Sequence, residues 1–213
     1  MQLKSVNVSL TKEIEYNGEL IKTGIFKQPV SGSVTISATQ INGDQQADLK
    51  NHGGEHKAVY GFASNHYDYW RKELNKPELS YGQFGENLSI SDLDEASLCI
   101  GDQLQLGDCI LEISQPRVPC FKLGMVMGLP TMPKLFIEHA HTGIYFRIIQ
   151  AGTVESGQTV ERILAHPEQL SVQTLFKAYF NKQFVGADKV MQQAETIGQL
   201  STEWRQKVLS RLK

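Results

Sequence analysis

The chain has 213 residues, of which 40% are hydrophobic and 21% are charged, a composition typical of a globular protein that buries a core. Its formal net charge of -2 lacks the basic excess of a nucleic-acid-binding protein, so we expect no nucleic acid as partner. No apolar run is long enough to span a bilayer, residues 1–5 lack the apolar core of a signal peptide, and we expect no membrane partner. Three cysteines without CxxC spacing suit a reducing compartment, which predicts a cytoplasmic protein.

The first part of the chain has the pattern of a β-protein. Val6, Val8 and Leu10 alternate with polar residues, as in a half-buried strand. The dipeptide Asn17-Gly18 separates two short apolar runs, and this arrangement is a strong signal for a β-hairpin. We therefore expect the chain to begin with several short strands.

A polar segment with a double glycine follows at residues 44–57. Gly53 and Gly54 disfavour a helix and permit a ligand to approach the backbone closely. His52 and Lys57 would supply positive donors beside the exposed amides, which suits an anion. A plain polar surface loop is the alternative when these residues are considered alone.

Residues 84–88 lead from a glycine-containing loop into a predicted strand. Glu86 and Asn87 lie between apolar residues there and are candidates for burial. A buried carboxylate needs hydrogen-bond partners or a shifted pKa. The alternative is a turn in which both side chains bond the local backbone.

The segment 114–123 carries the cysteine with the most distinctive surroundings. Two prolines before Cys120 make the backbone stiff and extended, and residues 121–127 are expected to form a helix that starts at the cysteine. The helix N-terminus, Arg117 and Lys122 would all favour a thiolate, which binds a soft metal or attacks an electrophile. A buried, unreactive cysteine is the alternative.

Two other cysteines and one charge complete the β-rich part of the chain. Cys109 belongs to a predicted strand at residues 109–114 and Cys99 precedes a turn, so we expect both in the core. Arg147 lies within the apolar strand predicted at residues 144–149. A charge in that position needs a partner or a ligand, unless it lies on a solvated face of the strand.

The pattern changes near residue 166, where three helical stretches replace the strands. They are expected at about residues 171–181, 187–195 and 201–212. Helices this short must pack against something else to be stable. We therefore predict a β-rich domain at residues 1–165 and a C-terminal three-helix extension at residues 166–213.

Three motifs occur in a fixed order along the chain: His52-Gly53-Gly54 with Lys57, residues 84–88, and residues 115–120. Together they resemble the MOSC family, named for the C-terminal domain of molybdenum-cofactor sulfurase, and in particular its YiiM-like branch. The resemblance covers nearly the whole chain, including the helices. It implies a mainly β fold with α (α+β), in which a small three-helix domain follows a β-barrel-like core.

The resemblance also implies a cofactor and a reaction. MOSC proteins bind the molybdenum cofactor (molybdopterin), and the cysteine that matches Cys120 ligates molybdenum. Relatives among the amidoxime-reducing enzymes reduce N-hydroxylated compounds to amines, with Glu86 or a water here expected to supply protons. Many relatives have arginine where Lys57 stands, and lysine cannot make the same forked contact, so its role stays open. The residues expected to hold the cofactor are His52, Gly53, Gly54, Lys57, Asn87, Arg117 and Arg147.

The sequence contains no iron–sulfur cysteine cluster and no flavin fingerprint, so a separate reductase is expected to supply electrons for an N-hydroxylated small molecule. A homodimer is left open, and the helices are expected to shape substrate access. Two alternatives remain: a sulfur carrier with a Cys120 persulfide and no redox turnover, or a hydrolase or transferase in which Cys120 is a nucleophile paired with His52 or His139. A zinc site at His52 and His56 is weaker, because the glycines between them do not hold a helical pair.

Overall fold

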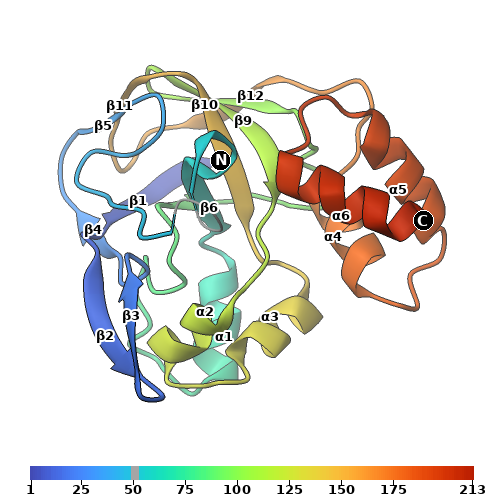
Figure 1. The fold of residues 1–213 in the computed structure, drawn as a ribbon. Coiled ribbons are helices and arrows are strands. Elements are labelled where there is room, and N and C mark those ends of the chain that lie inside the picture. The colour runs from blue at the N-terminus through green and yellow to red at the C-terminus, as the bar shows by residue number, and fades with distance from the viewer. Residues whose placement is uncertain (49–52) are drawn as a thin grey trace.

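The structure is a computed structural model that describes residues 1–48 and 53–213. Its largest element is an eight-stranded sheet, which is antiparallel except for one parallel pair, Val59–Ala63 with Leu88–Ser91 (Figure 1). The strands lie in the order β12 (Val160–Leu164), β8 (Gln103–Leu106), β9 (Cys109–Pro116), β10 (Ile144–Gln150), β6 (Val59–Ala63), β7 (Leu88–Ser91), β1 (Gln2–Val8) and β4 (Gln28–Val30).

The sheet curls but does not close in the part of the chain that the structure describes. Strands β12 and β4 are its edges, and a single bridge between Gln2 and Thr159 brings the start of β1 against the residue before β12. A closed barrel needs every strand to be paired on both sides. The α+β fold with a large sheet is therefore confirmed, whereas the barrel-like closure is not.

Two smaller two-stranded sheets flank the large one. The hairpin of β2 (Lys12–Tyr16) and β3 (Glu19–Thr23) confirms the predicted turn, because Asn17 and Gly18 have the positive φ angles of 52° and 81° that a tight hairpin turn requires. The second small sheet pairs β5 (Val34–Ile36) with β11 (Gly152–Val154).

Three helices, α1 (His66–Glu73), α2 (Phe121–Met127) and α3 (Met132–His139), lie together beside the sheet (Figure 1). Asn65 is the residue immediately before the first residue of helix α1. Trp70 and Phe136 from these helices pack with Phe62 and Phe84 in a buried aromatic cluster. Helix α2 packs on this cluster, which therefore helps to fix the position of the segment that contains Cys120.

The three predicted C-terminal helices are present as α4 (Val172–Phe180), α5 (Ala187–Thr196) and α6 (Thr202–Leu212) (Figure 1). Val172, Leu175 and Trp204 belong to the same buried cluster as residues of the sheet. The helices thus share the core of the sheet, and the boundary at residue 165 stays a prediction. No helix in the described ranges is both long enough and apolar enough to cross a bilayer.

Candidate functional site

Cys120 lies between the end of β9 and the start of α2, as the sequence predicts. Pro116 is the last residue of β9, and Cys120 has an extended backbone (φ -123°, ψ 173°) immediately before the first helical residue. Its side chain is only half-buried, whereas Cys99 and Cys109 are buried in the core. The accessible cysteine is therefore the one that the motif identifies.

Cys120 forms part of the wall between two cavities. The first encloses about 90 Å³ and the second about 640 Å³. Lys57, Val118, Cys120 and Tyr145 line both. A third cavity of about 610 Å³ adjoins the first at residues 45–47. A ligand that reaches the thiol can therefore approach from either side of it.

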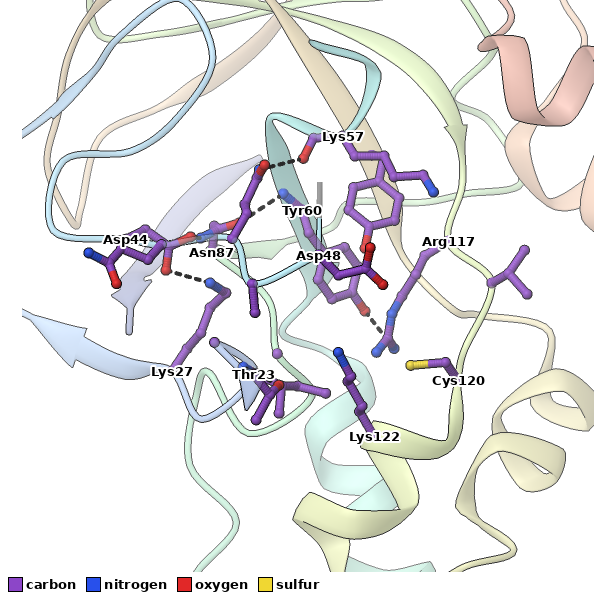
Figure 2. Close-up of a pocket in the computed structure, with 18 residues that line it drawn as sticks. Thr23, Lys27, Asp44, Asp48, Lys57, Tyr60, Asn87, Arg117, Cys120 and Lys122 are labelled. Carbon is purple, nitrogen blue, oxygen red and sulfur yellow. Dashed lines mark hydrogen bonds and ion pairs between the residues drawn. The ribbon is translucent and has the colours of Figure 1, made fainter. Parts of the chain in front are cut away.

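Arg117 is a buried cation next to the thiol. Figure 2 shows its guanidinium and the sulfur of Cys120 pointing toward one another, and both residues line the first cavity. The guanidinium lies 4.7 Å from the centre of the Tyr60 ring and donates a hydrogen bond of 3.3 Å to its hydroxyl. Burial lowers the pKa of Arg117, but the interactions with Tyr60, Tyr145 and Cys120 raise it by more than this. The net shift of the pKa is upward, so the side chain is charged. No carboxylate among the described residues forms an ion pair with it, and a buried charge of this kind favours an anionic neighbour.

A row of three side chains on neighbouring strands forms the floor of the site. Tyr145 on β10 pairs directly with Tyr60 on β6 and with Gln115 on β9, so all three point to the same face of the sheet. Burial raises the pKa of Tyr145 to about 12 and that of Tyr60 well above its ordinary value. Both phenols are therefore neutral. This row was not predicted from the sequence, because aromatic residues in strands are indistinguishable from core residues until the strand order is known.

The opposite wall of the first cavity is a closed hydrogen-bond network. Lys27 contacts Asp44 at 2.5 Å, and Asp44 accepts a second hydrogen bond of 3.0 Å from the amide of Asn87 (Figure 2). The amide oxygen of Asn87 in turn accepts from the backbone N–H of Tyr60 at 3.1 Å. Asn87 thus lines the cavity, as expected for a cofactor-binding residue, but its side-chain amide already forms hydrogen bonds with other residues of the wall.

Glu86 is fully buried and lines none of the three cavities. One carboxylate oxygen accepts hydrogen bonds from the hydroxyl of Tyr67, from the N–H of Gly82 at 2.8 Å and from the hydroxyl of Ser89 at 2.7 Å. Burial raises the pKa of this carboxyl group. Its role as a proton donor stays a prediction, since the cavities offer it no direct contact with a ligand.

The glycine loop lies beside Cys120, although His52 falls outside the described residues. Gly53 and Gly54 line the second cavity. Gly54 has φ +84°, which favours glycine, and no atom lies within 4 Å of the position of a Cβ there. Lys57 lines both cavities and forms an ion pair with Glu203 of α6. The structure therefore brings three of the four predicted residues of this motif to the site.

Arg147 lies elsewhere. Its guanidinium contacts Glu112 at 2.5 Å, the ring of His56 at 2.8 Å and the carbonyl of Gln199 at 2.8 Å. The charge of Arg147 in the predicted apolar strand is thus paired with a protein carboxylate, and Arg147 lines none of the three cavities. Its assignment to the cofactor stays an untested prediction.

The C-terminal helices contribute to the site at the first turn of α6. Ser201, Thr202 and Glu203 line the second cavity, together with Gln206 of the next turn. None of these residues was predicted to belong to the site, because nothing in their local pattern indicates which part of the sheet α6 contacts. The second cavity is therefore bounded by the sheet on one side and by the helical extension on the other.

The structure describes only one of the proposed histidine partners of Cys120, His139, because His52 lies outside the described residues. His139 lies on α3, where its ring contacts His66 and His141, and it lines none of the three cavities. Within the described ranges, no group of three or more histidine, cysteine, aspartate or glutamate side chains is arranged to hold a metal ion. A metal at Cys120 would therefore need further ligands from a bound cofactor or from residues outside those ranges.

Comparison with known proteins identifies the family. The MOSC domain matches residues 48–161. The protein YflK of Bacillus subtilis is 36% identical over 203 residues, which cover 94% of this chain and 90% of YflK. A protein named "Reductase" from Gibberella moniliformis is 36% identical over 183 residues, or 83% of this chain, but this match spans only 32% of the fungal protein. The crystal structure of YiiM from Geobacillus stearothermophilus superposes with a TM-score of 0.83 at 30% identity, covering 100% of this chain and 99% of YiiM. The chain therefore belongs to the MOSC domain family and is YiiM-like.

Proposed function

We propose that this protein binds the molybdenum cofactor and reduces N-hydroxylated compounds to amines, with electrons from a separate reductase. The observation that carries the proposal is the position of Cys120, half-buried between two cavities and beside the buried cation of Arg117. MOSC domains are generally associated with this cofactor, and the name of the fungal relative supports a reductive reaction.

The chemistry of the site residues fits the cofactor. A cysteine thiolate is the soft ligand that molybdenum accepts beside a dithiolene. Arg117 is a buried cation without a described carboxylate partner, which suits the negative charge of the dithiolene and the phosphate. The third cavity is polar, and its wall includes the amides of Gln40, Gln45 and Gln46, which can bond the edges of a pterin.

The sizes of the cavities indicate which part of the cofactor or substrate each cavity can hold. Binding sites for small molecules usually enclose about 300–1,000 Å³, so the first cavity of about 90 Å³ accommodates only an end group. We assign Cys120 to the metal, Arg117 and Lys122 to the anionic groups, and the third cavity to the pterin. The second cavity, on the other side of Cys120, is then left for the substrate.

When bound, the cofactor supplies the two-electron reduction of the N–O bond. Overall, that bond breaks, two electrons and two protons are consumed, and an amine and a water are released. The residues of this chain orient the substrate: Tyr145 presents a neutral phenol to the second cavity, and the Lys57–Glu203 ion pair closes part of its wall. Because Glu86 lines none of the three cavities described above, we assign proton delivery to water that enters the second cavity.

The proposal is tested on protein purified from a host that makes molybdenum cofactor. The protein should contain molybdenum and pterin in near-equal amounts, and should reduce benzamidoxime with reduced methyl viologen as electron donor. Cys120→Ser should abolish the reduction, because a hydroxyl is a much harder ligand than a thiolate. Cys99→Ser is the matched control, since that thiol is buried away from the cavities.

Substantial activity in Cys120→Ser would contradict the proposal. A protein that carries sulfane sulfur on Cys120 but no molybdenum would instead favour the sulfur-carrier alternative. Alkylation of Cys120 by an electrophilic substrate analogue in metal-free protein would favour a nucleophilic enzyme.

A further inference from the structure

The imidazole ring of His56 lies between Arg147 and the second cavity. His56 belongs to the short 3-10 helix η1 (Glu55–Lys57), and its side chain is 27% exposed. It lines the second cavity, whereas Arg147 does not. The hydroxyl of Ser114 on β9 donates a hydrogen bond of 2.5 Å to the carbonyl of His56, which holds the backbone of this residue against the sheet.

The contact with Arg147 determines which ring nitrogen of His56 carries the proton. The nitrogen Nη2 of Arg147 is 2.8 Å from Nδ1 of His56. A guanidinium group has N–H donors and no acceptor, so Nδ1 must be the unprotonated nitrogen that accepts this bond. In a neutral imidazole the other nitrogen is then the donor. The proton of His56 therefore lies on Nε2.

Arg147 is itself held in place by two further contacts. Its Nη1 contacts Glu112 at 2.5 Å, and its Nη2 also donates to the carbonyl of Gln199 at 2.8 Å. The two hydrogens of Nη2 are thus divided between this carbonyl and His56. Burial and the positive charge of Arg147 lower the pKa of His56, so the ring is neutral near pH 7. The position of Arg147 therefore fixes both the charge and the tautomer of His56.

The nitrogen Nε2 of His56 is on the side of the ring that faces the second cavity. It lies 3.4 Å from the hydroxyl oxygen of Thr202 and 3.5 Å from a carboxylate oxygen of Glu55, and both of these residues line that cavity. Both distances exceed the 2.7–3.2 Å of an ordinary N–H···O hydrogen bond. The Nε2–H group can therefore exchange these weak contacts for a stronger bond to a ligand.

The same geometry makes His56 a poor acid or base. Protonation of Nδ1 would place two donors against each other at the contact with Arg147. A neutral imidazole that cannot take up a second proton does not deliver one to a substrate. The group that His56 presents to the cavity is therefore an uncharged hydrogen-bond donor.

We infer that His56 binds the substrate by donating a hydrogen bond from Nε2 to an uncharged acceptor atom, and that Arg147 is the positioning residue that fixes this tautomer. The inference rests on the proposed function, because it takes the second cavity as the substrate site. It names a feature of the substrate remote from the reacting N–O group: a ring nitrogen or a carbonyl oxygen that can accept this bond. A substrate without such an atom would gain nothing from His56.

Nuclear magnetic resonance tests the tautomer on the purified protein without any ligand. A correlation spectrum between the ring nitrogens and the ring C–H protons of ¹⁵N-histidine-labelled protein shows which nitrogen is protonated, and the signals lost in His56→Gln assign His56. We expect a protonated Nε2 and an unprotonated Nδ1 from pH 8 to pH 6. In Arg147→Met with Glu112→Gln, which leaves no unpaired carboxylate behind, the ring should instead titrate within this range.

Calorimetry tests the bond to the substrate, on holoprotein without an electron donor so that no turnover occurs. The ligands are benzamidoxime and its three isomeric analogues in which nitrogen replaces one ring C–H group. One added hydrogen bond should make at least one pyridine analogue bind about three- to tenfold more tightly than benzamidoxime. His56→Phe should abolish this preference. His56→Gln should retain it, because a carboxamide can accept from Arg147 and donate to the ligand. Gln206→Met is the matched control and should behave as the wild type, since Gln206 is an exposed residue of the same cavity.

A proton on Nδ1 of His56, or a mixture of tautomers, would overturn the inference. So would equal binding of all four compounds by the wild type, binding of none of them, or an undiminished preference in His56→Phe. Turnover with reduced methyl viologen separates these results from the proposed function. A protein that prefers a pyridine analogue through His56 but reduces none of the compounds would contradict the proposed reaction and leave the role of His56 intact.

Discussion

Replacement of Trp204 by alanine should loosen the contact between the C-terminal helices and the sheet. The Trp204 side chain is fully buried, and its indole nitrogen donates a hydrogen bond of 3.0 Å to the carbonyl of Pro116, at the end of β9. Removal of a buried tryptophan side chain typically costs about 3–5 kcal/mol of folding free energy. A protein of this length loses about 2–4 °C in melting temperature per kcal/mol. We therefore expect Trp204→Ala to melt roughly 6–20 °C lower than the wild type.

Urea unfolding of the cofactor-free protein, followed by circular dichroism, measures this cost without a contribution from bound ligand. Trp204→Phe is the control: it keeps an aromatic ring and loses the hydrogen bond to Pro116, so it should cost only about 1–3 kcal/mol. A loss below about 1 kcal/mol for Trp204→Ala would refute the reasoning. It would mean that α6 does not depend on this contact for its position beside the second cavity.

Three further predictions concern charge and burial. Burial raises the pKa of Glu95 from 4.5 to about 8, so the folded protein binds this proton more tightly than the unfolded chain, and stability should fall as the pH rises between these values. Glu95→Gln should remove this decline, so the difference in urea midpoint between the wild type and the variant should change between about pH 5 and pH 8. A difference that stays constant over this range would contradict the raised pKa of Glu95. Arg147→Ala should cost about 3–5 kcal/mol in urea unfolding, because Glu112 is left buried without its partner, whereas lost pterin with unchanged stability would favour the cofactor role. Cys109→Ser should cost about 1–3 kcal/mol by burying a hydroxyl, and lost activity at an unchanged melting temperature would show that Cys109 belongs to the site.

Features that depend on a few consecutive residues are predictable from the sequence. The hairpin at Asn17-Gly18 requires only two residues that tolerate positive φ, and both adopt it. Helix α2 begins after Cys120 because the prolines before it prevent an earlier start. The three C-terminal helices likewise follow from their apolar spacing.

Features that depend on which strands are neighbours are not predictable in this way. Arg147 has Glu112 as its partner because β9 and β10 pair in one register, and nothing near Arg147 in the sequence indicates this. The row of Tyr60, Tyr145 and Gln115 likewise exists only after three strands are placed side by side. The family resemblance was sufficient to identify Cys120. The residues that form the walls of the cavities beside it could be identified only once the order of the strands was known.

The central claim is that Cys120 holds molybdenum, and X-ray absorption at the molybdenum edge tests it most directly. Holoprotein is compared with Cys120→Ser protein purified from the same host, with the molybdenum content of each measured in parallel. We predict that the variant either has one sulfur ligand fewer than the wild type or fails to retain the metal. A variant with full molybdenum content and an unchanged sulfur coordination would show that Cys120 is not a ligand, and would contradict the account.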